Sequence, residues 1–260
     1  MKAYDKVLAA RAGGRPTAAS FIEGIFTDFI EMHGDRRYAD DPAVIAGIAR
    51  LNGRPVTVIG IERGATLEER MRRNFGSAHP EGYRKALRQM RLAEKFRRPV
   101  VCLVDTSGAA CDIGAEERGE GQAIAENLTT MMGLRVPIVS VVIGEGGSGG
   151  ALALAVADEV WMLENAVYSV ISPEGAASIL WKDAGAADRA SECLKLTAHD
   201  LRRMEVVEHV FRERDGWPRV YDNLRAALWK ALGHYAGMGE EALLAHRYEK
   251  FRKIGRMGEA

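Results

Sequence analysis

The chain has 260 residues, of which 47% are apolar and 28% charged, the balance of an ordinary soluble globular protein. Its 36 lysines and arginines are matched by 36 aspartates and glutamates, so the formal net charge is zero. This balance argues against a nucleic-acid or anionic-membrane protein held by bulk charge. It leaves self-association or a protein partner open.

Cysteine usage and hydropathy indicate the compartment. The three cysteines form no C-x-x-C pair, and no cysteine and histidine cluster has the spacing of a zinc site. The N-terminus leads into no apolar signal-type stretch, and no apolar run approaches the roughly 18 residues of a membrane span. We therefore expect a cytoplasmic chain with no membrane segment, no metal ligands and no nucleic-acid partner.

Hydrophobic spacing predicts an alternation of helices and strands. The expected helices are residues 21–30, about 80–98, 115–132, 151–157, 222–236 and 240–253. The expected strands are residues 44–51, 55–61, 100–104, 137–143, 159–163 and 166–171. Asn52-Gly53 between the first two strands is a hairpin signal. Continuous apolar strands alternating with helices indicate an α/β protein with a mostly parallel sheet covered on both faces.

A glycine-rich segment at residues 144–150 follows one buried strand and opens a helix. It satisfies the G-x-G-x-x-G pattern of dinucleotide-binding loops, with Glu164 twenty residues after Gly144. Glu145, however, would bring a carboxylate against a pyrophosphate, and the following helix is apolar on every side. No lysine follows the glycines, so a P-loop is excluded.

Backbone N–H groups at such a turn suit an oxyanion, because they lack intrahelical partners and glycine permits close approach. A purely structural role in tight helix packing is the alternative. The preceding strand ends in a second loop, residues 105–112, and adjacent strand ends line one crevice in open α/β sheets. Gly108 and the pair Gly149-Gly150 could therefore aim N–H groups at one point, which suggests acyl-CoA chemistry.

Six stretches together make the chain resemble the α subunits of the carboxyltransferase component of bacterial acetyl-CoA carboxylase. They are residues 34–41 (GDRRYADD), 73–76 (RNFG), 80–87 (PEGYRKAL), 114–119 (GAEERG), 144–150 (GEGGSGG) and 168–175 (YSVISPEG). They occur in family order and are far more specific than a lone glycine pattern.

The resemblance implies a crotonase-like fold built from ββα units. It implies an N-terminal helical segment over residues 1–33, a carboxyltransferase core over 34–210 and C-terminal interface helices over 211–260. The expected partners are a β subunit, in an α₂β₂ assembly, and a biotin carboxyl carrier protein. The expected reaction moves a carboxyl group from carboxybiotin on that carrier to acetyl-CoA and gives malonyl-CoA. Zinc is expected on the β subunit and not on this chain.

The resemblance also assigns the site. Gly149 and Gly150 are the expected catalytic residues, whose N–H groups stabilise the biotin ureido oxyanion. Residues expected to bind biotin or substrate are Gly108, Ala109, Gly146, Gly147, Ser148 and Arg118. For Arg118, pairing with neighbouring acids is the alternative. The six histidines show no triad or metal spacing, and Cys111 has no histidine placed to make it a nucleophile.

Two departures from the family pattern stand out. The family loop reads Asp-Thr-Pro-Gly-Ala-Tyr-Pro-Gly, where residues 105–112 read Asp-Thr-Ser-Gly-Ala-Ala-Cys-Asp. Losing two prolines predicts a more mobile loop, with Asp112 near the biotin entrance. The family usually begins with a longer helical extension, so assembly is expected to depend on the sheet edge and C-terminal helices. A non-catalytic scaffold, or a carboxyltransferase for another acyl-CoA, remains an alternative.

A basic excess marks residues 62–98, which hold 11 lysines and arginines against 5 acids. A solvated helix face explains it, and contact with CoA phosphates or an acidic carrier is the alternative. The amphipathic C-terminal helices leave a similar choice between a solvated flank and a subunit interface.

Overall fold

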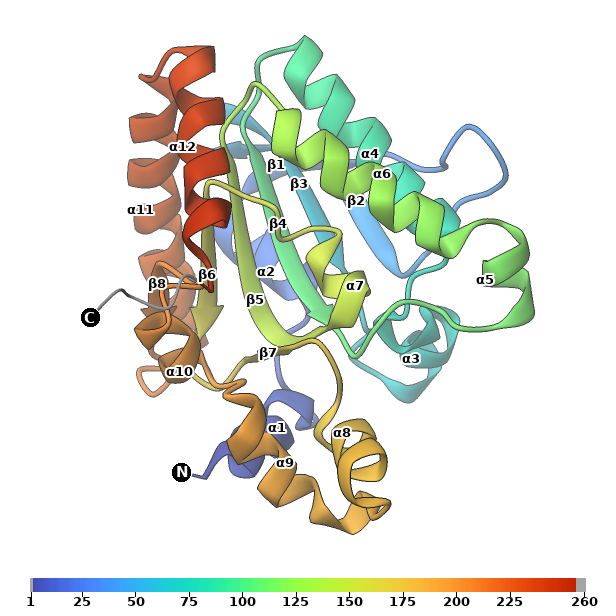
Figure 1. Ribbon diagram of the computed structural model, residues 1–260. Coiled ribbons are helices and arrows are strands. Elements are labelled where there is room, and N and C mark those ends of the chain that lie inside the picture. The colour runs from blue at the N-terminus through green and yellow to red at the C-terminus, as the bar shows by residue number, and fades with distance from the viewer. Residues whose placement is uncertain (1, 256–260) are drawn as a thin grey trace.

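The computed structural model describes residues 2–255 (Figure 1). The strands are β1 (Thr27–Glu31), β2 (Val44–Leu51), β3 (Arg54–Ile61), β4 (Val100–Thr106), β5 (Ile138–Gly147), β6 (Glu159–Leu163), β7 (Val167–Ser169) and β8 (His209–Phe211). The α-helices are α1 (Ala3–Arg11), α2 (Ala18–Ile25), α3 (Leu67–Arg72), α4 (Pro80–Lys95), α5 (Ile113–Glu117), α6 (Glu120–Gly133), α7 (Ser148–Leu152), α8 (Pro173–Trp181), α9 (Ala187–Leu194), α10 (Ala198–Arg203), α11 (Trp217–Ala236) and α12 (Glu240–Lys253). Short 3₁₀ turns occupy Asn74–Gly76 and Ala184–Ala186.

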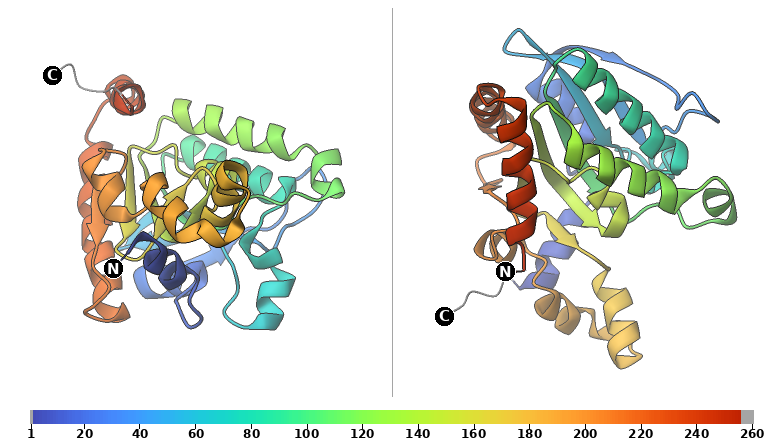
Figure 2. Two further views of the ribbon diagram at one scale, coloured as in Figure 1. Left: turned by 60° about the horizontal axis from the view of Figure 1, so that its bottom comes forward. Right: turned by 45° about the horizontal axis from the view of Figure 1, so that its top comes forward.

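One sheet organises the chain, with strand order β1-β2-β3-β4-β5-β6-β8 and β7 paired with the end of β5. β1, β2 and β3 are antiparallel, and the pairs from β3 to β8 are parallel. Helices α4 and α6 cover one face, and α2 and α11 cover the other (Figures 1 and 2). Every residue of β4 is buried, as a parallel strand covered on both faces requires. The predicted α/β class and parallel sheet are confirmed.

A small lobe of α1, α8 and α9 lies below the edge at which β5 ends, and the left view of Figure 2 brings this lobe forward. The lobe has two small apolar clusters of its own. It therefore stands beside the carboxyl ends of the central strands, where parallel sheets form their crevices.

Helix α12 is fixed to the sheet by a buried ion pair. The Arg247 guanidinium, fully buried, donates to both carboxylate oxygens of Asp158 at 2.9 and 3.0 Å. Its other N–H groups donate to the carbonyl oxygens of Met131, Leu134 and Val136 at 2.6 to 3.1 Å. Every guanidinium nitrogen is used, so the C-terminal helix is part of the packed molecule. Of the expected segment 211–260, residues 256–260 lie outside the described part.

The hairpin was predicted correctly, and Asn52-Gly53 forms its turn with φ values of 47° and 83°. The helix predicted over residues 21–30 is wrong from residue 26 onward, because α2 ends at Ile25. Residues 27–31 form β1, which pairs antiparallel with β2 across a register shift. Pairing with β2 overrides the helical spacing of the apolar residues.

Other helices also differ from their predicted bounds. The helix predicted over 115–132 is two helices, because Gly119 at φ 81° separates α5 from α6. The helix predicted over 151–157 begins earlier and ends at Leu152, whereas β5 continues through the glycines to Gly147. The extension follows from pairing, since this end of β5 bonds to β7 on one side and meets Thr106 on the other.

Candidate functional site

The ends of β4 and β5 lie side by side, so the loops that follow them pack against each other. Thr106 is paired with Gly146 in the sheet. A Cβ atom added at Gly147 would lie 2.1 Å from the carbonyl oxygen of Ser107, and one at Gly146 would lie 2.8 Å from the ring of Tyr168. Both positions therefore require glycine for packing, and the two loops predicted to line one crevice do meet.

Gly150 is also packed closely against the second loop. A Cβ atom there would lie 2.6 Å from Ala109 N, 2.8 Å from the Tyr83 hydroxyl and 2.9 Å from Gly108 C. At Gly149 the nearest atoms would be side-chain carbons of Ile124 at 3.7 Å, an ordinary contact. Of the two predicted catalytic glycines, Gly150 is thus buried against the second loop, while Gly149 is half-buried and could take a Cβ atom at ordinary contact distance.

The turn from β5 into α7 leaves backbone donors unused. Ser148, exposed and with φ 52°, reverses the chain, and Gly149 and Gly150 follow in the first turn of α7. Among the described residues no hydrogen bond is made by the N–H of either glycine. Two adjacent donors without intrahelical partners can accept an anionic oxygen.

Gly108 offers no such donor. Its N–H donates to Thr106 Oγ1 at 3.0 Å, and the same hydroxyl donates to Gly108 O at 2.7 Å. The expectation that Gly108 aims an N–H at the shared point is therefore wrong for this geometry. The N–H of Ala109 is unbonded among the described residues and lies beside Gly150. Ala109 can therefore supply the donor that was predicted for Gly108.

The Glu145 carboxylate is buried and neutralised. Arg11 of α1 donates to it at 2.7 Å and Arg63, after β3, at 2.9 Å. Glu145 N donates to Asp105 at 2.9 Å, and Arg63 also pairs with Asp105 at 3.2 Å. Burial raises the pKa of Asp105, although Arg63 beside it acts in the opposite direction.

Sequence reasoning missed these partners, because Arg11 and Arg63 lie far away in the chain. The available signal was a carboxylate at the end of an apolar strand, which needs a buried cation. Arg11 also donates to Glu174 of α8 at 2.7 Å. The N-terminal helix thereby joins the glycine turn to the lobe.

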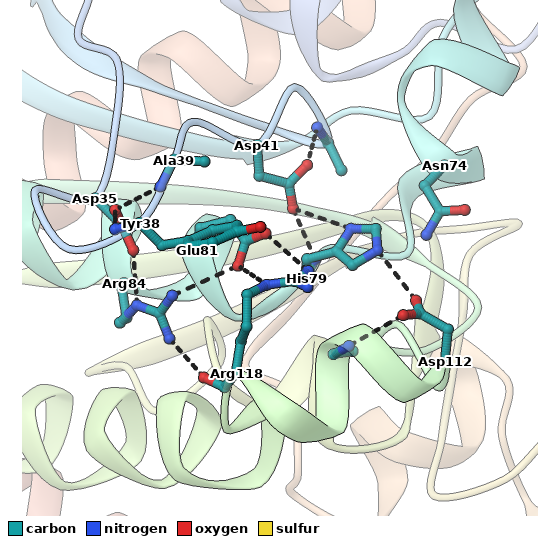
Figure 3. A network of polar contacts seen from close by, with 12 residues as sticks. Asp35, Tyr38, Ala39, Asp41, Asn74, His79, Glu81, Arg84, Asp112 and Arg118 are labelled. Carbon is teal, nitrogen blue, oxygen red and sulfur yellow. Dashed lines mark hydrogen bonds and ion pairs between the residues drawn. The ribbon is translucent and has the colours of Figure 1, made fainter.

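Arg118 lies in a different network, shown in Figure 3. Its guanidinium donates to both oxygens of Glu81 at 3.2 and 3.0 Å and lies over the Tyr38 ring at 4.8 Å. It makes no hydrogen bond to residues 144–150 in the described chain. Arg118 therefore forms an ion pair, but with Glu81 on α4 and not with the acidic residues next to it in the sequence.

The unusual end of the second loop also has a structural role (Figure 3). Asp112 caps α5 by accepting the Ala115 N–H at 3.0 Å, and its other oxygen contacts His79 Nε2 at 3.1 Å. His79 N donates to the buried Asp41 at 2.7 Å. Cys111 is an exposed free thiol. The loop is therefore tied to the start of α4.

An apolar cavity of about 390 Å³ adjoins the glycine turn. Its lining includes Ser148, Gly149, Leu152, Tyr168, Val170 and Phe251. Residues 2–255 contain no group of three or more His, Cys, Asp or Glu side chains that could hold a metal ion. Within the same residues, no helix is long and apolar enough to cross a membrane.

The sequence profile of the family described as acetyl co-enzyme A carboxylase carboxyltransferase-like matches residues 1–255. The chain belongs to this family. The carboxyltransferase-like chain is 62% identical over 256 residues to "Acetyl-coenzyme A carboxylase carboxyl transferase subunit alpha" of Ruminiclostridium cellulolyticum, covering 98% of each chain. It is 55% identical to the protein of that name in Halalkalibacterium halodurans, covering 98% of this chain and 80% of the relative.

A longer relative carries both subunit names. The "subunits beta/alpha" protein of Natranaerobius thermophilus is 54% identical, and the match covers 98% of this chain and 43% of that protein.

Solved structures share the fold at low identity. The carboxyltransferase-like chain superimposes on transcarboxylase 12S with a TM-score of 0.71 and 23% identity, over 90% of this chain and 44% of that one. It superimposes on a chain of a Pseudomonas malonate decarboxylase hetero-tetramer with a TM-score of 0.66 and 16% identity, over 81% and 86% of the two chains. The expected crotonase-like α/β fold is confirmed.

Proposed function

We propose that this chain is the α subunit of an acetyl-CoA carboxylase carboxyltransferase. With a β subunit, it moves the carboxyl group from carboxybiotin on a carrier protein to acetyl-CoA and forms malonyl-CoA. The names of relatives up to 62% identical support this function. The observation that carries it is the pair of N–H groups at Gly149 and Gly150, which are unbonded among the described residues and lie next to an apolar cavity that Gly149 lines.

The chemistry needs a site for negative charge more than it needs an acid or a base. When carboxybiotin gives up its carboxyl group, charge collects on the ureido oxygen. Fixed backbone donors stabilise such charge without having to reorganise during the reaction. Ala109 N lies beside Gly150 and could complete the set. The apolar cavity next to Gly149 suits the hydrocarbon part of biotin.

The remaining site residues have different proposed tasks. Gly147 lets the two loops approach, and Gly146 leaves room for the Tyr168 ring. Ser148 sets the turn, and Gly108 shapes the second loop through Thr106. Arg118 could bind a substrate carboxylate only after breaking its hydrogen bonds to Glu81. We therefore propose Arg118 as a loop-positioning residue.

We further propose an α₂β₂ assembly in the cytoplasm, served by a biotin carboxyl carrier protein, with any zinc on the β subunit. The fused beta/alpha relative supports pairing with a β partner. Exposed apolar side chains near the cavity and lobe, Leu152, Val170, Ile179 and Leu180, fit a protein-covered surface. We propose that residues 34–210 form the carboxyltransferase core.

The test is reconstitution. The chain is purified with and without the β subunit, and malonyl-CoA formation is measured with carboxylated carrier protein. We expect activity only from the pair, and a preference for acetyl-CoA over propionyl-CoA. Full activity of this chain alone would refute the two-subunit proposal. An assembled but inactive pair would favour the scaffold alternative, and a preference for propionyl-CoA would change the substrate.

A further inference from the structure

A second cavity lies on the outer side of α4, against the loop that begins at Gly34. It has a volume of about 380 Å³. Figure 3 shows two of its lining residues, Arg84 of α4 and Asp35 of the loop, in contact with each other. The cationic side chains that line it are Arg36, Arg37, Arg84, Arg88, Arg91 and Lys95.

Six cations face a single carboxylate in this cavity, so its lining has an excess of five positive charges. The carboxylate, on Asp35, is already occupied. One of its oxygens accepts Arg84 Nε at 2.7 Å, and the other accepts the N–H groups of residues 37, 38 and 39 at 2.7 to 3.1 Å. It therefore neutralises little beyond Arg84.

Four of the six cations have no carboxylate within ion-pair distance among the described residues: Arg36, Arg88, Arg91 and Lys95. The other two are paired, Arg84 with Asp35 and Arg37 with Glu126 at 3.6 Å. Neighbouring like charges without counter-ions repel one another, and a bound anion would relieve that repulsion.

Two of these unpaired guanidinium groups are held in place before any ligand arrives. Arg88 donates to Gly34 O at 3.0 Å and to His33 O at 2.9 Å, and Arg36 donates to His33 O at 2.9 Å. Burial, followed by the nearby Arg36, lowers the pKa of Arg88. Arg88 Nη1 makes no hydrogen bond among residues 2–255, so this end of a fixed guanidinium group can still donate to a phosphate oxygen and loses little freedom on binding.

We propose that this cavity binds an organic polyphosphate, a small molecule with two or more phosphate groups. The concave shape favours a small molecule over the flat contact of an acidic protein. Five of the six cations are arginines, which bind phosphate in a bidentate manner. The four cations without an ion-pair partner among the described residues exceed what a single phosphate neutralises.

Two sources of this chemistry are possible, a free nucleotide or the phosphates of the acyl-CoA substrate. The second rests on the proposed function. It is geometrically reasonable because α4 starts beside the second glycine loop, where Ala110 N donates to Ala78 O at 2.9 Å. Arg88 lies eight residues beyond Pro80, roughly 12 Å along the helix.

The primary test is independent of catalysis. Binding of ADP, coenzyme A and adenosine to the full chain is measured by calorimetry at low and moderate salt. We expect ADP and coenzyme A to bind and adenosine not to bind. Arg91→Gln with Lys95→Gln should weaken binding by about tenfold or more, since two charge-assisted contacts are lost. The matched control, Arg72→Gln with Arg219→Gln, removes two exposed arginines elsewhere and should leave binding unchanged.

Binding of neither phosphate compound, equal binding of adenosine, or equal affinity of the cavity variant and the control would overturn the proposal. Binding of an acidic protein alone would overturn it as well. The source is settled in the reconstituted enzyme. If the cavity takes acyl-CoA phosphates, the cavity variant raises KM for acetyl-CoA with little change in kcat. If it takes a free nucleotide, KM stays unchanged while ADP binding is lost. A failure of the proposed function leaves the binding result intact.

Discussion

Replacing Gly150 with alanine tests how tightly the two glycine loops are packed. The added Cβ would lie 2.6 Å from Ala109 N and 2.9 Å from Gly108 C, distances that backbone atoms cannot accept without moving. The Tyr83 hydroxyl, at 2.8 Å, blocks a third direction. Overpacking of this kind costs about 1–3 kcal/mol. In a chain of this size that lowers Tm by about 2–4 °C for each kcal/mol.

Gly149→Ala is the matched control, because its Cβ would meet nothing closer than 3.7 Å. Alanine is favoured over glycine within a helix by roughly 0.5–1 kcal/mol, so this variant should be as stable as the wild type or slightly more stable. Thermal and urea unfolding of both variants measure the difference. Equal stability of the two would refute the close packing of Gly150. In the reconstituted enzyme, Gly150→Ala should also slow the reaction about a hundredfold, because the second loop is displaced.

Three further predictions concern buried groups. Asp158→Ala leaves the Arg247 charge buried without its carboxylate and should lower the free energy of unfolding, measured in urea titrations, by about 3–5 kcal/mol. A loss below about 1 kcal/mol would instead be typical of a solvent-exposed ion pair and would contradict its burial. Burial raises the pKa of Glu120 from 4.5 to about 8, so between these pH values the folded chain holds a proton that the unfolded chain has lost. The contribution of Glu120 to the free energy of unfolding should therefore be highest below pH 4.5 and fall as the pH rises through 8. Glu120→Gln should reduce the change in unfolding free energy over this pH range, and an unchanged slope would contradict the raised pKa of Glu120. Tyr83→Phe removes a buried hydroxyl that has no hydrogen-bond partner among residues 2–255 and should stabilise the chain by about 1 kcal/mol, so destabilisation would contradict this.

Strong local signals predicted much of the fold. The turn residues Asn52-Gly53 fixed one hairpin, and Pro80 marked the start of α4. The errors arose where tertiary contacts override local spacing. Residues 27–31 pair with β2 although their spacing is helical, and β5 continues to Gly147 because neighbouring strands bond to it.

The site was predicted in part. Adjacent strand ends brought residues 105–112 and 144–150 together, as parallel-sheet geometry requires. Side-chain partners could not be predicted in this way. Arg11 and Arg63 reach Glu145 from distant segments, and the Gly108 N–H is consumed by a local contact with Thr106. Such contacts depend on the three-dimensional conformations of the loops, which the spacing of apolar residues does not predict.

The most direct test of the central proposal is the turnover of the Gly149→Val enzyme, reconstituted with its β subunit. A branched side chain would add bulk beside two N–H groups that make no hydrogen bond among the described residues, so the ureido oxygen could no longer approach them. The account predicts an assembled enzyme of normal stability whose kcat falls about a hundredfold or more, with little change in KM for acetyl-CoA. An assembled Gly149→Val enzyme with wild-type kcat would contradict it.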